Sequence, residues 1–104
     1  MLIVRGVNVY PSQIEAALLE AEGTLPHYQL VLLREEGLDQ LMVEVEVTPE
    51  VFSDTVRALE SLQHRLSQAI ERTVGLRVGV RLVEPRSIPR SEGKAKRVID
   101  RRSS

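Results

Sequence analysis

Residues 41–48, with the sequence Leu-Met-Val-Glu-Val-Glu-Val-Thr, place an apolar side chain at every second position. A period of two is typical of a β-strand that buries one face and leaves the other in water. Glu44 and Glu46 share the second face of this strand, and we expect both carboxylates to be solvated. The stretch therefore predicts a half-buried strand.

A long amphipathic helix is predicted directly after this strand. Thr48 is a typical N-cap, and Pro49 suits the first helical position because a first-turn N–H has no partner within the helix. Apolar residues recur at helical spacing over 51–74, and Gly75 ends the pattern. A second alternating stretch at 76–82 then predicts the final strand.

The N-terminal part of the chain predicts a strand, a helix and a second strand. Residues 2–4 are apolar and lead into a tight bend. A helix is expected at about 12–22, because Ser12 and Glu15 match the S-x-x-E capping box, in which each side chain satisfies a free first-turn N–H. Residues 28–33 are apolar and strand-like.

The order strand, helix, strand, strand, helix, strand favours an α+β domain. Two helices on one face of an antiparallel sheet would bury both apolar stripes, which is the ferredoxin-like βαββαβ arrangement. A chain of 104 residues supports one core, so we expect a single domain with a body at 1–84 and a tail at 85–104.

The total charge of −1 conceals an asymmetry between body and tail. Residues 85–104 contain seven basic and two acidic residues, a net charge of +5, whereas the body has a net charge of −6. A basic tail of this kind can meet a phosphate-bearing partner, fold back on its own body or remain solvated.

The composition excludes several kinds of site. The chain contains no Cys, which removes disulfides, thiol nucleophiles and Cys-ligated zinc. His27 and His64 have no second ligand at metal-binding spacing, so no metal site is expected. No apolar run approaches the roughly 20 residues of a membrane span, and Arg5 follows the N-terminus too closely for a signal peptide. We expect a cytoplasmic protein without membrane contact.

Two segments contain residues that a purely structural role does not explain well. They are residues 5–15, RGVNVYPSQIE, and residues 88–98, IPRSEGKAKRV. Together they resemble the C-terminal domain of adenylate-forming enzymes, the superfamily of acyl-CoA synthetases, peptide-synthetase adenylation domains and luciferases. The chain is most similar to phenylacetate-CoA ligases, whose motifs run R-G-x-N-V-[FY]-P-S-Q-I-E and G-K-A-x-R-V-x-D-R-R. The resemblance extends over essentially the whole chain.

The resemblance implies an AMP-forming acid–thiol ligase. A carboxylic acid and ATP form an acyl-adenylate and pyrophosphate, and CoA then displaces AMP to give the acyl-CoA. The expected acid is phenylacetate or another aryl acid, as in aromatic acid catabolism. Mg²⁺ is expected to accompany ATP and not to be bound by this domain.

In the family, a large N-terminal domain binds ATP and the acid, and the small C-terminal domain rotates as a lid between the two half-reactions. This sequence contains no phosphate-binding loop or adenine-binding motif. We therefore expect the lid alone, inactive in isolation and partnered by an N-terminal adenylate-forming domain, with a homodimer as a further option. In relatives an acidic hinge residue precedes the segment matching Met1, so the chain is expected to be a fragment that starts just past the hinge.

The resemblance assigns adenylation catalysis to Lys94. Carboxylate attack on the α-phosphate brings two anions together, and an ammonium group that reaches both offsets their repulsion. Gly93 would allow close backbone approach and Pro89 would stiffen the loop. Arg90 and Arg97 are expected to support the loop or the phosphate. The alternative is that Lys94 is a solvated tail residue.

The resemblance assigns Arg5, Gly6, Val7 and Asn8 to the passage for the pantetheine arm of CoA, in the thioester-forming pose. A Gly there would leave room for a slender thiol chain. The alternative is a plain turn, in which Gly6 supplies a positive φ and Asn8 tolerates one. Many superfamily members carry Arg at the position of Asn8, so contacts attributed to that Arg do not transfer.

Two other function classes remain as alternatives. A stand-alone ferredoxin-like regulatory domain would bind a small molecule between paired domains and would not need Lys94. A nucleic-acid module could use the basic tail, but such folds read bases with aromatic side chains on the sheet, and Tyr10, Tyr28 and Phe52 form no stacking platform. No nucleic-acid partner is therefore expected.

Overall fold

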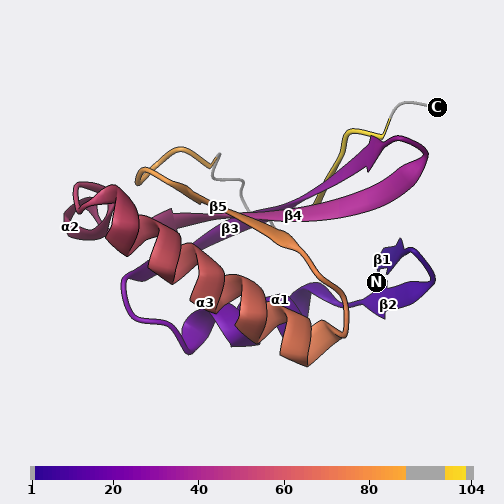
Figure 1. Cartoon of the computed structure of the whole chain (residues 1–104), viewed down its shortest axis with the longest axis horizontal. Helices are drawn as coiled ribbons and strands as arrows, with labels where there is room; N and C mark the ends of the chain where they lie inside the picture. Colours follow the sequence, from indigo (N-terminus) through magenta and orange to yellow (C-terminus); the bar gives the residue numbers. More distant parts are fainter. Residues whose placement is uncertain (1, 89–97, 103–104) are drawn as a thin grey trace.

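A computed structural model describes residues 2–88 and 98–102 of the chain. Two short strands precede the first helix, and a four-stranded sheet with two further helices follows (Figure 1). The elements in chain order are β1 (Leu2–Val4), β2 (Val7–Val9), α1 (Pro11–Leu19), β3 (Thr24–Glu35), β4 (Leu38–Val47), α2 (Pro49–Phe52), α3 (Val56–Val74), β5 (Gly79–Val83) and β6 (Val98–Asp100).

The main sheet has the strand order β5-β4-β3-β6. Its centre is the antiparallel hairpin of β3 and β4, in which Leu32 faces Leu41. Helices α1 and α3 contact each other and lie on one side of this sheet (Figure 1). The predicted α+β class, with helices on one face of the sheet, is confirmed.

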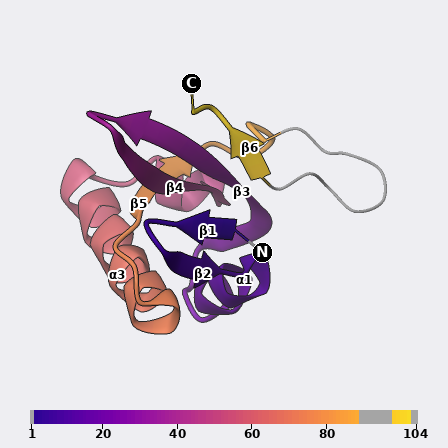
Figure 2. The ribbon, with the colours of Figure 1, turned by 90° about the vertical axis from the view of Figure 1, so that its right-hand side faces the viewer.

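The predicted antiparallel ferredoxin-like strand order is corrected, because the sheet is mixed. Strand β5 runs parallel to β4, and β6 runs parallel to β3. The strand predicted at residues 2–4 pairs locally with β2 and lies apart from the main sheet (Figure 2). A two-residue turn closes this hairpin without a long loop. The edge beside β3 is then filled by β6, from the tail.

The core lies between the helices and the sheet. Val43 and Val45 of β4, together with Leu66 and Ile70 of α3, have at most 1% of their surface exposed. Burial of such side chains contributes about 1.5–3 kcal/mol each. Among the helices in the described ranges, none is both long enough and apolar enough to cross a lipid bilayer.

The long helix predicted after β4 is two helices. Thr48 caps α2 as expected, with its Oγ1 accepting the Val51 N–H at 3.3 Å, and Gly75 ends α3 with φ of 77°. The break falls at residues 53–55, where Thr55 becomes a second N-cap and accepts the Ala58 N–H at 3.1 Å. Short polar side chains at the break compete for backbone hydrogen bonds that would otherwise continue the helix.

The predicted boundaries and cap of the first helix are also corrected. Helix α1 begins at Pro11, so Ser12 already lies inside its first turn. The Tyr10 N–H donates to Gln13 Oε1 at 3.1 Å, which makes Gln13 the residue that reaches back to the helix start. The pair Ser12 and Glu15 does not form the predicted capping box.

The second face of β4 is covered by other parts of the chain. The prediction that it is solvated is wrong. Glu44 is 9% exposed and Glu46 is 0% exposed. The chain that follows β5 crosses the side of the sheet opposite the helices (Figure 1), and Ile88 of this segment is buried. A second layer therefore covers the face that carries the two acidic side chains.

Candidate functional site

The two sequence motifs differ in how much of them the structure describes. The first motif lies wholly within the described residues, on the turn between β1 and β2, on β2 and on the start of α1. The five residues proposed from the second motif lie outside the described residues; they are Pro89, Arg90, Gly93, Lys94 and Arg97. The segments on both sides of residues 89–97 are described, and both are attached to the sheet.

The first motif forms the tip of the β1–β2 hairpin. Val4 faces Val7 across the hairpin, which leaves Arg5 and Gly6 as a two-residue turn with φ of 49° and 79°. Two successive positive φ values are the signature of a type I′ turn. A Cβ placed on Gly6 would meet nothing within 4 Å, so the tip opens into free space.

The hairpin is fixed to the core by one side chain from each strand. Val4 and Val9 are both fully buried, whereas Arg5, Gly6 and Asn8 are exposed and Val7 is half-buried. Asn8 lies within β2 and does not use the positive φ that its residue type tolerates. The structure therefore brings the four predicted residues together on one anchored, protruding hairpin.

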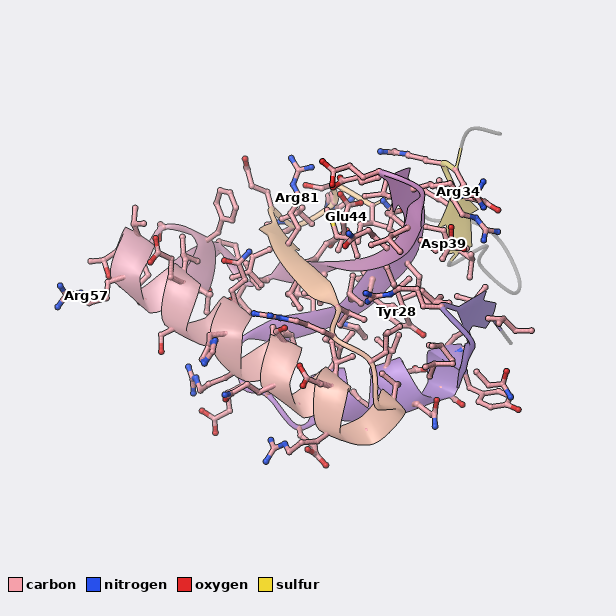
Figure 3. All side chains as sticks on the ribbon, turned by 45° about the vertical axis from the view of Figure 1, so that its right-hand side comes forward. Tyr28, Arg34, Asp39, Glu44, Arg57 and Arg81 are labelled. Atoms are coloured by element: carbon pink, nitrogen blue, oxygen red, sulfur yellow. The ribbon has the colours of Figure 1, made fainter. Side chains whose placement is uncertain are left out.

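The segment after residue 97 is tied to the β3–β4 hairpin. Strand β6 pairs with β3, and the Arg101 N–H donates to the Leu32 carbonyl at 2.8 Å. The Arg102 guanidinium donates to Asp100 at 2.7 Å and to Asp39 at 3.0 Å, and Arg34 donates to Asp39 at 2.9 Å. Figure 3 shows Arg34 and Asp39 beside β6. This end of the basic tail thus folds back on the body.

These ion pairs lower the pKa of both acidic groups. The hydrogen bond from Arg102 lowers the pKa of Asp100 to about 2. The hydrogen bond from Arg34, assisted by Arg102, lowers the pKa of Asp39 below its usual value. Both carboxylates therefore stay ionised and keep their cationic partners through the mildly acidic range.

The segment before residue 89 is tied to β4 by Glu46. One oxygen of its buried carboxyl group accepts the Arg86 N–H at 2.8 Å, and the other accepts the Ile88 N–H at 3.0 Å. A hydrogen bond to a charged group contributes about 1.5–3 kcal/mol to the stability of the fold. Glu46 therefore holds the chain that leads into the second motif.

Glu44 has different partners on the same face of β4. Its carboxyl group accepts a hydrogen bond from Gln29 Nε2 on β3, and it lies 3.5 Å from a guanidinium nitrogen of Arg81 on β5. In Figure 3 Glu44 and Arg81 lie close together on this side of the sheet. Glu44 therefore links β4 to its two neighbouring strands, β3 and β5.

Sequence reasoning missed Glu46 and the Asp39–Arg102 pair as supports of the second motif. The available signal was two acidic residues on a strand in a chain with an oppositely charged tail. His27 is half-buried and His64 exposed. Within residues 2–88 and 98–102, no group of three His, Asp or Glu side chains could hold a metal ion.

Comparison with known proteins identifies the family. The sequence pattern of the AMP-binding enzyme C-terminal domain matches residues 6–102, which include the second motif and all of the first except Arg5. The chain belongs to this family. As an AMP-binding enzyme C-terminal domain, it is 44% identical to phenylacetate-coenzyme A ligase from Thermus thermophilus, over 98% of this chain and 26% of that protein. The chain thus spans about a quarter of this curated relative.

Solved structures give the same placement. A 2-hydroxyisobutyryl-CoA ligase in complex with 2-HIB-AMP and CoA, in the thioesterification state, matches 98% of this domain and 21% of that chain, with a TM-score of 0.88 and 39% identity. A domain of phenylacetate-coenzyme A ligase from Bacteroides vulgatus matches all of this domain and 94% of that chain, with a TM-score of 0.87 and 31% identity. The observed mixed sheet is therefore the fold of this family.

Proposed function

We propose that this domain is the mobile C-terminal domain of an ATP-dependent acyl-CoA ligase, with phenylacetate or another aryl acid as substrate. The proposal is supported by its similarity to phenylacetate-CoA ligases across almost the whole chain. Its partner is an N-terminal domain that binds ATP with Mg²⁺ and the acid. The observation that carries the proposal is the joint presence of both motifs in one family match.

In the first half-reaction, Lys94 would act as the catalytic cation. An ammonium group between the acid carboxylate and the α-phosphate stabilises the charge that develops during transfer. In the second half-reaction, the β1–β2 tip would line the pantetheine passage. The exposed turn and the free space around Gly6 suit the approach of a narrow chain.

The alternatives gain no support from a specific contact. A stacking surface for nucleic acids would need exposed aromatic rings on the sheet, but Tyr28 is 4% exposed, Phe52 lies in α2 and Tyr10 precedes α1. A small-molecule sensor would need no anchored segment leading to Lys94. The ligase role gives a task to both motifs, so we prefer it to these two alternatives.

A substrate screen tests the proposal. The full-length protein that contains this domain is incubated with ATP, Mg²⁺, CoA and a panel of aryl and aliphatic acids, and AMP, pyrophosphate and acyl-CoA are measured. We expect equal amounts of AMP and acyl-CoA with phenylacetate or another aryl acid. Absence of AMP-forming turnover with every acid would contradict the proposed function.

A further inference from the structure

Glu46 is a buried acidic residue that the two proposed half-reactions leave without a task. It is fully buried on the side of the sheet opposite the helices. Its oxygens accept the N–H groups of Arg86 and Ile88, which follow 40 and 42 positions later in the chain. Buried carboxyl groups are costly unless they are hydrogen-bonded. Both of these N–H groups belong to the chain that leads to Lys94.

The turn held by Glu46 is strained. The Ser87 N–H donates to the Glu84 carbonyl at 3.2 Å, and Arg86 in the centre of this turn has φ of 68°. Pro85 and a positive φ at the next position are typical of a type II turn, in which Gly is favoured at the second central position. A non-glycine residue keeps this conformation only where its surroundings impose it. Glu46 supplies that constraint through the Arg86 amide.

We propose that Glu46 is a positioning residue for the adenylation half-reaction, a role that rests on the proposed function of Lys94. Lys94 follows Ile88, whose N–H group Glu46 accepts, by six positions in the sequence. Val98, four positions after Lys94, is fixed by its pairing with β3. Glu46 therefore fixes the last described residues before segment 89–97, as the pairing of β6 with β3 fixes the first described residues after it.

The effect of losing this anchor is on geometry and not on charge at the reacting atoms. A displacement of a catalytic group by about 1 Å can lower the rate by about 100-fold. Thioester formation uses the β1–β2 tip, and this hairpin is held in the core by Val4 and Val9 and not by Glu46. Loss of Glu46 should consequently affect adenylation and spare the CoA step.

The test uses Glu46→Gln in the full-length enzyme. Glutamine keeps the size and one acceptor oxygen, but its NH₂ group faces a backbone N–H donor. We expect ATP–pyrophosphate exchange to fall by about tenfold or more, while CoA capture of preformed acyl-adenylate stays within about twofold. Glu44→Gln is the matched control, because it lies on the same face of the same strand and contacts Gln29 and Arg81; both rates should stay near wild type.

A double variant distinguishes positioning from general structural damage. If Glu46 acts through Lys94, Glu46→Gln has no further effect on exchange in a Lys94→Ala background. A further loss there, or an equal loss of both half-reactions in a folded single variant, would overturn the role. Unchanged ATP–pyrophosphate exchange in Lys94→Ala would instead overturn the proposed function of the lysine. Loss in Lys94→Ala with normal exchange in Glu46→Gln would overturn the role of Glu46 alone.

A thermal melt and amide exchange keep the test decisive. If Glu46→Gln unfolds below the assay temperature, Glu46→Asp, which keeps both acceptors on a shorter side chain, is measured in its place with the same expected split. In the 104-residue chain, hydrogen exchange at the Arg86 and Ile88 amides should accelerate in Glu46→Gln and not in Glu44→Gln. Unchanged exchange at both amides would contradict the anchoring role.

Discussion

The β1–β2 tip offers a direct test of the pantetheine passage, because the chain contains a second turn of the same geometry. Arg5 and Gly6 have φ of 49° and 79°, while Glu36 and Gly37 between β3 and β4 have φ of 51° and 80°. A Cβ added to either glycine meets nothing within 4 Å. Gly6→Ile and Gly37→Ile therefore introduce the same side chain into the same backbone strain.

The strain predicts equal losses of stability. An L-residue in the left-handed region costs roughly 1–2 kcal/mol, and a β-branched residue is at the upper end. For a domain of this size, each 1 kcal/mol lowers the melting temperature by about 4–8 °C. We expect both variants of the 104-residue chain to melt about 5–15 °C lower than wild type and within a few degrees of each other.

Rates of the two half-reactions, measured in the full-length enzyme, then distinguish a pantetheine passage at Gly6 from a purely structural turn. Gly6→Ile should lower CoA capture of preformed adenylate by about 100-fold, because the isoleucine fills the space proposed for pantetheine. Adenylation in Gly6→Ile and both steps in Gly37→Ile should stay near wild type below the melting range. Equal loss of the CoA step in the two variants would refute the passage and leave Gly6 as a turn residue only.

Three further outcomes are expected from the domain itself. The isolated chain should show no ATP–pyrophosphate exchange, since a few cations attract a triphosphate only weakly in salt; detectable exchange would contradict this. Thr55→Ala should lower the free energy of unfolding by about 1 kcal/mol, whereas Ser12→Ala, which removes no cap, should change it by less than about 0.5 kcal/mol in a denaturant titration. The pKa of Asp100, lowered to about 2, gives stability that is complete above the unfolded pKa of about 4 and is lost as the pH falls toward 2. Melts between pH 6 and pH 2.5 should show a smaller loss in Asp100→Asn than in wild type; identical losses would contradict the contribution of the ion pair.

The sequence was a good guide to elements whose signals are local. Alternation in residues 41–48, the cap at Thr48 and the stop at Gly75 predict structure from neighbouring residues alone, and the strand, the cap and the helix end are confirmed. The break before α3 was missed because Thr55 looks like part of the apolar stripe until its hydroxyl is seen to cap Ala58.

Strand partners and the second layer depend on contacts between residues far apart in the chain. The apolar residues 2–4 predict a strand of the main sheet. In the structure a two-residue turn pairs them with β2, and β6 is the strand that pairs with β3 at the edge of the sheet. Glu46 is predicted to be solvated, because the alternating pattern of one strand does not show which distant segment crosses its second face. Arg86, in the tail segment that covers it, follows 40 residues later. The role of Lys94 comes from family resemblance and stays a prediction.

The central claim is that one small domain serves two half-reactions with two different surfaces. The most direct measurement is the pair of half-reaction rates in full-length Lys94→Ala. Because the proposed role of the lysine is to stabilise charge only in the first transition state, ATP–pyrophosphate exchange should fall by about 100-fold or more while CoA capture of preformed acyl-adenylate stays close to wild type. Equal loss in both half-reactions, or normal exchange without the lysine, would contradict the account.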